Sequence, residues 1–231
     1  MPTRRRFLQQ AAGASLAVSA LSSSAASYAR ILGANDRLGV GVIGLGRRLR
    51  AFVPPISDAE NNVDLLYLCD VMKSQRTNAA TLFSEQMSHD AKLENDIRKV
   101  IDDPKVDVII NATPDHWHAP GTIMALQGGK HVYVEKPSSH NMREDELMVA
   151  AQKKHGKAVQ MGTQQRSSAH TIEVIKAIHE GAIGTPYRAV AWYSNGRGEV
   201  PVQKKMPVPK GLDWDLFLGP APRREYTEET W

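Results

Sequence analysis

Short apolar runs alternate with helix-like stretches between Leu38 and Gly162, and this rhythm constrains the fold more than any other feature of the chain. The runs with the length and composition of buried strands are Leu38–Ile43, Val63–Cys69, Val106–Asn111, His131–Glu135 and Ala158–Gly162. Strands separated by helices are typical of a parallel sheet that is built from right-handed crossovers. We therefore predict an α/β fold with a doubly wound parallel sheet of the Rossmann type.

Helices are predicted between these strands from apolar spacing and from glycines that follow their ends. The first is expected to be cut short by Pro54 and Pro55, because proline lacks the backbone N–H that a helix interior needs. The predicted helices are Arg48–Ile56, Lys73–Met87, Asp96–Ile101, Gly121–Gln127 and Arg143–Lys154.

The regular alternation of predicted strands and helices stops after Gly162. A helix with one apolar stripe (Ile172, Ile175 and Ile178) is predicted to end at Gly181, and Tyr187–Tyr193 alternates like a strand. Residues 197–210 are rich in Pro and Lys and are predicted to form a loop. We therefore expect one domain over residues 36–162 and the beginning of an α+β domain over residues 163–231, which the chain does not complete.

The first 29 residues have the order of an export signal, with basic residues, an apolar stretch and a small-residue cleavage site. Arg4–Arg6 followed by Phe-Leu resemble the twin-arginine signal. We expect a twin-arginine signal peptide over residues 1–29, a partner in the twin-arginine export machinery, and a periplasmic or otherwise exported protein. The apolar stretch is too short and too rich in small residues for stable membrane insertion.

Charge and cysteine content exclude several classes of protein. The net charge is +4, and three of these charges come from Arg4–Arg6, so the remaining chain is nearly neutral. A neutral body has no electrostatic footprint for a phosphate backbone, and we expect no nucleic-acid partner. A single Cys excludes a disulfide framework and a cysteine-only zinc site.

Glycines at the end of the first predicted strand fit a dinucleotide-binding loop in two frames. Gly39, Gly41 and Gly44 match G-x-G-x-x-G, but the first two lie within the strand, whereas phosphate contact needs glycines after it. The workable frame is therefore residues 44–49, which read Gly-Leu-Gly-Arg-Arg-Leu. Leu49 stands where a third small residue controls the packing of helix on sheet, which predicts a wider approach or an altered turn.

Asp70 ends the second predicted strand, close to the spacing expected of the acidic residue that binds a ribose. A carboxylate at this place accepts hydrogen bonds from ribose hydroxyls and repels a 2′-phosphate, which favours NAD over NADP. Arg47 and Arg48 leave NADP open because guanidinium groups pair with phosphate, and they equally suit the pyrophosphate. A turn or capping role for Asp70 is the structural alternative.

Two motifs follow neighbouring strands. Asn-Ala-Thr-Pro-Asp-His-Trp-His over residues 111–118 follows the third predicted strand, and Glu-Lys-Pro over residues 135–137 follows the next. Open α/β sheets bind ligands at the carboxyl edge of their strands, so both motifs are expected to face one crevice.

Together with the Gly44 loop, Asp70 and Gly-Thr-Gln-Gln-Arg at residues 162–166, these motifs resemble the Gfo/Idh/MocA oxidoreductases. The resemblance covers the chain from about Leu38 onward. It implies an NAD(P)-dependent enzyme that removes hydride from an alcohol, with Lys136 as the catalytic residue that takes up or relays the proton. It also implies substrate contacts from Lys136 and Arg166, and a cis peptide bond before Pro137.

The cofactor-binding residues predicted in this way are Gly44, Leu45, Gly46, Arg47, Arg48, Asp70, Thr113, Pro114, Asp115, His116, Trp117, His118, Glu135, Lys136 and Gln164. No metal site is predicted, because His116 and His118 have no third ligand nearby in the sequence. The second catalytic histidine of the family is expected beyond Trp231.

The leading functional hypothesis is an oxidoreductase that acts on a sugar, polyol or glycoside through a tightly bound NAD, with NADP as the alternative cofactor. A small carbohydrate is the expected substrate, and self-association into a homo-oligomer is left open. A glycosidase or lyase that oxidises C3 transiently is the first alternative. The second is a nucleotide-binding fragment without chemistry.

Overall fold

A parallel sheet forms the body of the protein. The computed structural model describes residues 37–84, 86, 87, 89–194, 196, 199 and 202–227, so the predicted signal peptide lies outside the described residues. Within this part, the strands are β1 (Leu38–Ile43), β2 (Val63–Cys69), β3 (Lys92–Glu94), β4 (Val108–Asn111), β5 (His131–Glu135) and β6 (Val159–Gly162). They are all parallel and lie in the order β3-β2-β1-β4-β5-β6, which confirms the predicted Rossmann-type sheet.

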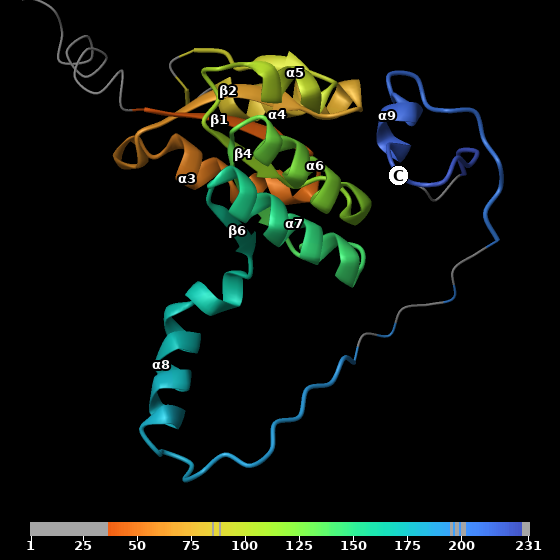
Figure 1. Ribbon diagram of the computed structural model, residues 1–231. Coiled ribbons are helices and arrows are strands. Elements are labelled where there is room, and N and C mark those ends of the chain that lie inside the picture. The colour runs from red at the N-terminus through yellow and green to blue at the C-terminus, as the bar shows by residue number, and fades with distance from the viewer. Residues whose placement is uncertain are drawn as a thin grey trace, which may run out of the picture.

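Helices cover both faces of the sheet (Figure 1). The helical segments are η1 (Arg47–Ala51), α3 (Val53–Ser57), η2 (Ala59–Asn61), α4 (Lys73–Ser84), α5 (Ile97–Asp102), α6 (Asp115–Gln127), α7 (Met142–His155), η3 (Gln164–Ser167), α8 (Ala169–His179) and α9 (Trp214–Leu218). One core cluster joins α5, α6 and α7 to the sheet, and a second joins η1, α3 and α4 to its other face. The two clusters make the three-layer arrangement of a doubly wound fold.

The glycines inside β1 have a packing role. A Cβ atom at Gly39 would lie 2.0 Å from the carbonyl oxygen of Lys105, and one at Gly41 would lie 2.6 Å from a methyl group of Val100. Such contacts leave no room for a side chain, so α5 and the turn before β4 approach β1 closely. Gly39 and Gly41 are thus strand residues, which agrees with placing the dinucleotide-binding loop at residues 44–49 rather than 39–44.

Several element boundaries differ from the sequence prediction. Pro54 and Pro55 do not end a helix; they stand in the first turn of α3, where a missing N–H costs nothing. Helix α6 starts at Asp115 rather than near Gly121, and Pro120 is accommodated inside it. Strand β3 was not predicted, because three residues on an edge carry no readable alternation.

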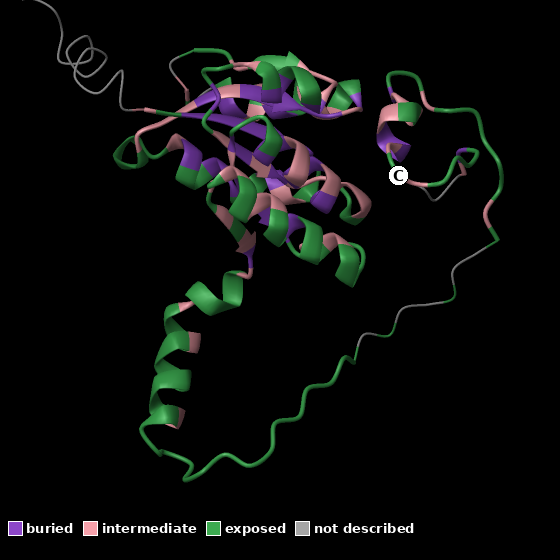
Figure 2. Cartoon of the chain, in the orientation of Figure 1, coloured by how far each residue is buried: buried purple, intermediate pink, exposed green. Residues whose placement is uncertain are grey.

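The predicted strand at Tyr187–Tyr193 is absent from the described structure. This segment pairs with no described strand, and Tyr187 is 97% exposed. A strand needs a neighbour that accepts its backbone hydrogen bonds, which alternation of side chains alone cannot provide. The predicted apolar helix is present as α8, but it projects from the sheet with Ile172 and Ile175 exposed (Figures 1 and 2).

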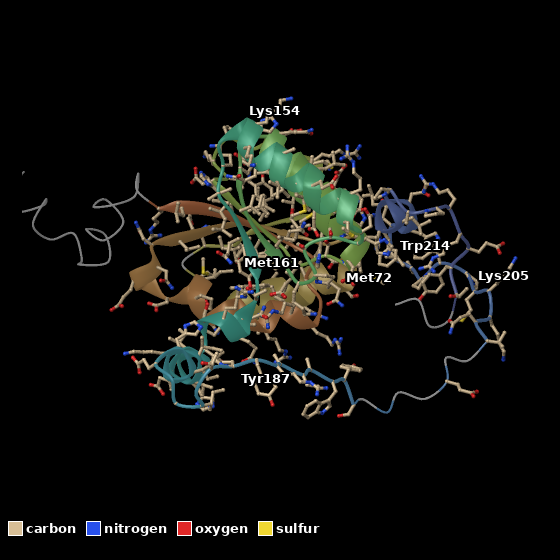
Figure 3. All side chains as sticks on the ribbon, turned by 60° about the horizontal axis from the view of Figure 1, so that its bottom comes forward. Met72, Lys154, Met161, Tyr187, Lys205 and Trp214 are labelled. Atoms are coloured by element: carbon tan, nitrogen blue, oxygen red, sulfur yellow. The ribbon has the colours of Figure 1, made fainter. Side chains whose placement is uncertain are left out.

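The chain returns to the sheet at its end. Residues 211–226 pack beside the carboxyl edge, where Met72, Leu212, Phe217, Leu218 and Tyr226 form a third buried cluster. Figure 3 shows Trp214 in this region and Tyr187 on the long exposed connection that precedes it. None of the helices among the described residues has both the length and the apolar character to cross a membrane.

Candidate functional site

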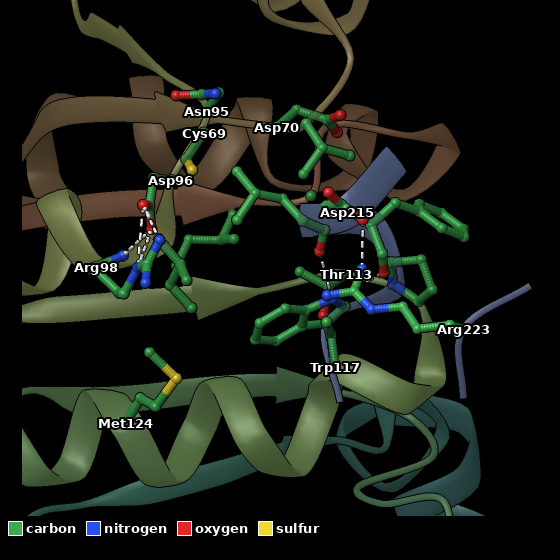
Figure 4. Close-up of a pocket in the computed structure, with 18 residues that line it drawn as sticks. Cys69, Asp70, Asn95, Asp96, Arg98, Thr113, Trp117, Met124, Asp215 and Arg223 are labelled. Atoms are coloured by element: carbon green, nitrogen blue, oxygen red, sulfur yellow. Dashed lines mark hydrogen bonds and ion pairs between the residues drawn. The ribbon is translucent and has the colours of Figure 1, made fainter. Parts of the chain in front are cut away.

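A cavity of about 380 Å³ lies at the carboxyl edge of β1, β2 and β4 (Figure 4). The sheet, α5 and α6 form one side of it, and the segment around α9 forms another. Its lining residues are Ile43, Gly44, Cys69, Asp70, Val71, Asn95, Asp96, Ile97, Arg98, Thr113, Pro114, Trp117, Met124, Asp215, Leu216, Phe217, Gly219 and Arg223. The carboxyl edge is the ligand-binding edge of an open α/β sheet.

The glycine loop turns sharply out of β1. Gly44 has a φ of +84°, and a Cβ atom there would lie 2.4 Å from the carbonyl oxygen of Ala112, so only glycine fits. At Gly46 the position of a Cβ atom is open, which leaves the backbone accessible to a ligand. The next residues form the 3₁₀ turn η1 with Leu49 buried, so the altered turn that Leu49 predicted is present.

Asp70 holds the glycine loop against the end of β2. Its two carboxylate oxygens accept hydrogen bonds from the backbone N–H groups of Leu45 and Met72, each at 2.8 Å. Burial raises the pKa of Asp70, and these two hydrogen bonds and the charge of Arg76 oppose the rise. Asp70 therefore has the capping role in the structure, and it also lines the cavity, while its contact with a ribose stays a prediction.

Glu135 is the centre of a second polar cluster, at the ends of β5 and β6. Its buried carboxylate accepts hydrogen bonds from Arg48 Nε at 2.6 Å, Gln164 Nε2 at 2.9 Å and the Tyr133 hydroxyl at 3.2 Å. Burial alone would raise the pKa of Glu135, but the hydrogen bonds from Arg48, Gln164 and the Lys136 N–H lower it overall. Arg48 is therefore paired with a carboxylate.

Lys136 follows directly, with its side chain exposed. Its backbone N–H donates to Glu135 at 3.2 Å, and the Lys136–Pro137 peptide bond is cis, as the resemblance implied. The ammonium group is thus presented to solvent from the rigid end of a buried strand. Lys136 is not among the residues that line the cavity around Asp70.

Buried side chains connect the β4 turn to the β5 turn. Asn111 donates to the carbonyl of His118 at 3.0 Å and accepts from the Thr113 hydroxyl at 2.6 Å. The ring of His118 is 1% exposed; Nε2 lies 2.7 Å from the Thr113 carbonyl, and Nδ1 contacts the Pro137 carbonyl. His118 was predicted to contact the cofactor, but its buried ring instead bridges the backbone carbonyls of the two turns.

The remaining residues of this motif lie at the start of α6. His116 Nε2 lies 2.7 Å from the Phe217 carbonyl, and Trp117 donates to the same carbonyl at 3.0 Å while its ring lines the cavity. Pro114 caps the helix, and Asp115 is exposed in its first turn. His116 and Trp117 therefore contact a segment one hundred residues away in the sequence, which no local pattern indicates.

Some of the predicted site residues lie outside both the cavity beside Asp70 and the polar cluster around Glu135. Arg47 is exposed on the 3₁₀ turn, and Arg166 borders a separate surface hollow beside α8. Conversely, Asn95, Asp96 and Arg98 line the cavity although they were not predicted as site residues, since they follow the unpredicted strand β3. Among the described residues, no group of three or more His, Cys, Asp or Glu side chains is placed to hold a metal ion.

The arrangement fits a dinucleotide that lies along the carboxyl edge. The cavity beside β2 is lined by an acidic side chain and apolar walls, the open backbone at Gly46 follows β1, and the Glu135 cluster follows β5. The sheet order separates β2 from β5 by three strand spacings, about 14 Å. An extended dinucleotide spans such a length, with its phosphates at the glycine loop.

The lowered pKa of Glu135 predicts how stability depends on pH. A carboxyl group with a folded-state pKa below its unfolded value, about 4.3, stabilises the fold above that value, and this contribution is lost as the pH falls through the folded pKa. Urea unfolding of the protein and of Glu135→Gln is expected to show a stability difference at neutral pH that shrinks as the pH falls from about 5 to 3. The exposed Glu60→Gln serves as the control, and a difference that is constant over this range would contradict the prediction.

Comparison with known proteins places the chain in a family. Residues 38–163 match GFO_IDH_MocA, described as an oxidoreductase family with an NAD-binding Rossmann fold. Inositol 2-dehydrogenase of Salmonella typhimurium is 27% identical over 150 residues, which cover 64% of this chain and 44% of that protein. A glycosyl hydrolase family 109 protein of Saccharopolyspora erythraea is 29% identical over 201 residues, which cover 79% of this chain and 43% of that protein.

Among solved structures, the WlbA dehydrogenase of Bordetella pertussis, in complex with NADH and UDP-GlcNAcA, superimposes with a TM-score of 0.58 at 24% identity. The match covers 64% of this chain and 43% of that one, and it shows a shared fold. The chain thus spans less than half the length of these relatives. The match over residues 38–163, together with the sheet order, shows that the chain belongs to the Gfo/Idh/MocA family of oxidoreductases.

Proposed function

We propose that the protein is an NAD-dependent oxidoreductase that acts on a hydroxyl group of a sugar, polyol or glycoside. The observation that carries the proposal is the placement of three elements along one sheet edge: the Gly44 turn, Asp70 beside the cavity, and the Glu135–Lys136 turn. The 27% identity to an inositol 2-dehydrogenase supports a polyol or sugar as the substrate class.

The residues of the second cluster have complementary roles in this proposal. Bound nicotinamide supplies the hydride acceptor. Lys136 takes the hydroxyl proton of the substrate through the neutral amine form of its side chain and becomes an ammonium group, and its exposed position after the buried strand end supports this role. Glu135 is held by Arg48 and Gln164, which keeps the strand end rigid and presents a polar surface to the nicotinamide ribose. Arg166 is the proposed substrate contact from the following segment.

Asp70 favours NAD over NADP in this proposal. Both of its oxygens already accept backbone hydrogen bonds, yet each carboxylate oxygen has a second lone pair for a ribose hydroxyl. A 2′-phosphate at the same place would meet a buried carboxylate, and Arg48, a potential partner for this phosphate, is bound to Glu135. The predicted export by a twin-arginine signal and the division into domains at residues 36–162 and 163–231 belong to the same proposal.

A glycosidase mechanism is the second candidate. The family 109 relative is a glycosyl hydrolase, and its alignment covers 79% of the chain, against 64% for the inositol dehydrogenase. Transient oxidation of C3 would acidify the proton on C2 and permit elimination of the aglycone across C1 and C2. Water would then add to C1 and a proton to C2, after which the hydride returns to C3. The two reactions differ in outcome, since this one leaves no net NADH.

Purification without added cofactor tests the proposal. The full chain is heat-denatured, and the released dinucleotide is identified by mass spectrometry, with stoichiometric NAD expected. NADP in its place would contradict the role given to Asp70, and no dinucleotide would contradict tight retention. If no dinucleotide is released, failure of this cofactor-free chain to bind added NAD in calorimetric titration would overturn the proposed function. Incubation with polyols and with aryl glycosides then separates NADH formation from release of the aglycone.

A further inference from the structure

We propose that residues 211–223, here called the C-terminal strap, form the outer wall of the pocket for the adenosine half of the dinucleotide. The inference rests on the proposed function and adds to it a binding element outside residues 38–163, the part that matches the family. Asp215, Leu216, Phe217, Gly219 and Arg223 all line the cavity at the carboxyl edge. The cavity is therefore open on this side without the strap.

The C-terminal strap is anchored at both borders of the cavity. At the end of β2, the Lys73 N–H donates to the Gly211 carbonyl at 2.9 Å, and the Asp213 N–H donates to the Val71 carbonyl at 3.1 Å. At the start of α6, Trp117 Nε1 donates to the carbonyls of Leu216 and Phe217, both at 3.0 Å. The strap thus crosses from one strand end to the next helix and covers the space between them.

Close packing holds the strap in this register. A Cβ atom at Gly219, where φ is +49°, would lie 2.1 Å from the indole ring of Trp117. The ring of Trp214 stacks on Phe217 at 5.0 Å between centroids, and Leu218 is buried. These contacts fix the position of Phe217, whose side chain borders the cavity opposite the sheet.

The chemistry of the lining fits adenosine. Ile97, Met124, Trp117 and Phe217 offer apolar and aromatic surface to a planar base, as adenine requires. Asp70 stands at the end of β2, the position of the ribose-binding acid in this fold.

The charges of the cavity favour a ribose without a 2′-phosphate. Among the described lining residues the basic ones are Arg98 and Arg223, and each is paired, with Asp96 and Asp215 respectively (Figure 4). Among the described lining residues, no basic side chain pairs with the carboxylate oxygens of Asp70. Arg76, which does not line the cavity, donates to the backbone carbonyl of Asp70. Both members of the Arg223–Asp215 pair belong to the strap, so the strap adds a mutually neutralised ion pair to the lining.

Gly219→Ala tests the proposal, with Gly156→Ala as the matched control. Both positions have a left-handed φ, but the added methyl group meets Trp117 at residue 219 and open space at residue 156. The probes are ADP-ribose and nicotinamide mononucleotide, titrated separately by calorimetry into the full chain after any retained dinucleotide has been removed by unfolding and refolding. We expect Gly219→Ala to weaken ADP-ribose binding by about tenfold, since an aromatic wall is displaced. Nicotinamide mononucleotide binding is expected to be unchanged, as is ADP-ribose binding to Gly156→Ala.

Hydrogen exchange of the unmodified protein provides a second measurement that does not depend on the folding of a variant. ADP-ribose is expected to slow exchange of the amides at residues 212–219, and nicotinamide mononucleotide is not. Unchanged exchange in the strap with ADP-ribose bound would overturn the inference, as would ADP-ribose binding to a folded Gly219→Ala at the affinity of the unmodified chain. Absence of binding of ADP-ribose and NAD to the unmodified chain, once it has been freed of retained dinucleotide, would instead overturn the proposed function.

Discussion

Replacing Lys136 with alanine is expected to lower the turnover of a sugar or polyol substrate by about 10³-fold, the usual effect of removing a positioned general acid or base. The side chain of Lys136 is exposed just after the end of β5, and among the described residues its ammonium group has no hydrogen-bond partner. Folding is therefore expected to be unaffected. The rate is measured as NADH formed from bound NAD in a single turnover, and cofactor retention is measured by mass spectrometry.

Lys153→Ala is the matched control, because it removes an exposed lysine near the end of α7, away from the carboxyl edge. It is expected to leave the rate and the retained cofactor unchanged. A Lys136→Ala protein with the rate of the unmodified enzyme would show that another group exchanges the proton. Loss of the cofactor together with the rate would assign Lys136 to binding rather than to proton transfer.

Replacing Gly44 with alanine is expected to be the most destabilising single change in the glycine loop, at about 4 kcal/mol. A left-handed φ costs an L-residue about 1–2 kcal/mol, and forcing a methyl group into a packed site adds about 1–3 kcal/mol. The atoms that it meets are the backbone carbonyl of Ala112 and the N–H of Thr113, both within 2.5 Å, so no side-chain rotation relieves the contact. Urea unfolding measures the loss.

Gly156→Ala separates the two contributions, because residue 156 has a φ of +63° and open space around a Cβ atom. This control is expected to lose only the backbone part, about 1–2 kcal/mol. Equal losses for the two variants would show that the turn between β1 and η1 moves away from β4 at little cost. At permissive temperature, Gly44→Ala is also expected to bind NAD at least tenfold more weakly, since the loop moves away from the position that Asp70 fixes.

The central strands of the sheet were predictable from the sequence, because burial requires apolar residues in continuous runs. Strands β1, β2 and β5 have the predicted boundaries, since each is an apolar run that stops at a glycine or at a charged residue. The carboxyl edge followed from topology, because parallel strands all end on the same side. Edge strand β3 has exposed residues and no pattern, and it was found only through its pairing with β2.

Contacts between segments that are distant in the sequence could not be predicted from the sequence alone. His118 stands in a motif that implied cofactor contact, yet its ring joins two buried carbonyls from turns on different strands. Arg48 lies in the phosphate-loop frame, and its partner, Glu135, is 87 residues away. The alternation in Tyr187–Tyr193 is present in the sequence, but no described strand pairs with it.

The sequence by itself determined the parallel sheet, the glycine turn at Gly44 and the positions of Asp70 and Lys136 at strand ends, because local periodicity and backbone geometry decide them. Only the folded arrangement shows that α9 lines the cavity, that Arg48 pairs with Glu135, and that His118 is internal. These features depend on contacts between segments that are distant in the sequence. Such a contact imposes no periodic pattern on the residues of either segment, so only the three-dimensional structure reveals it.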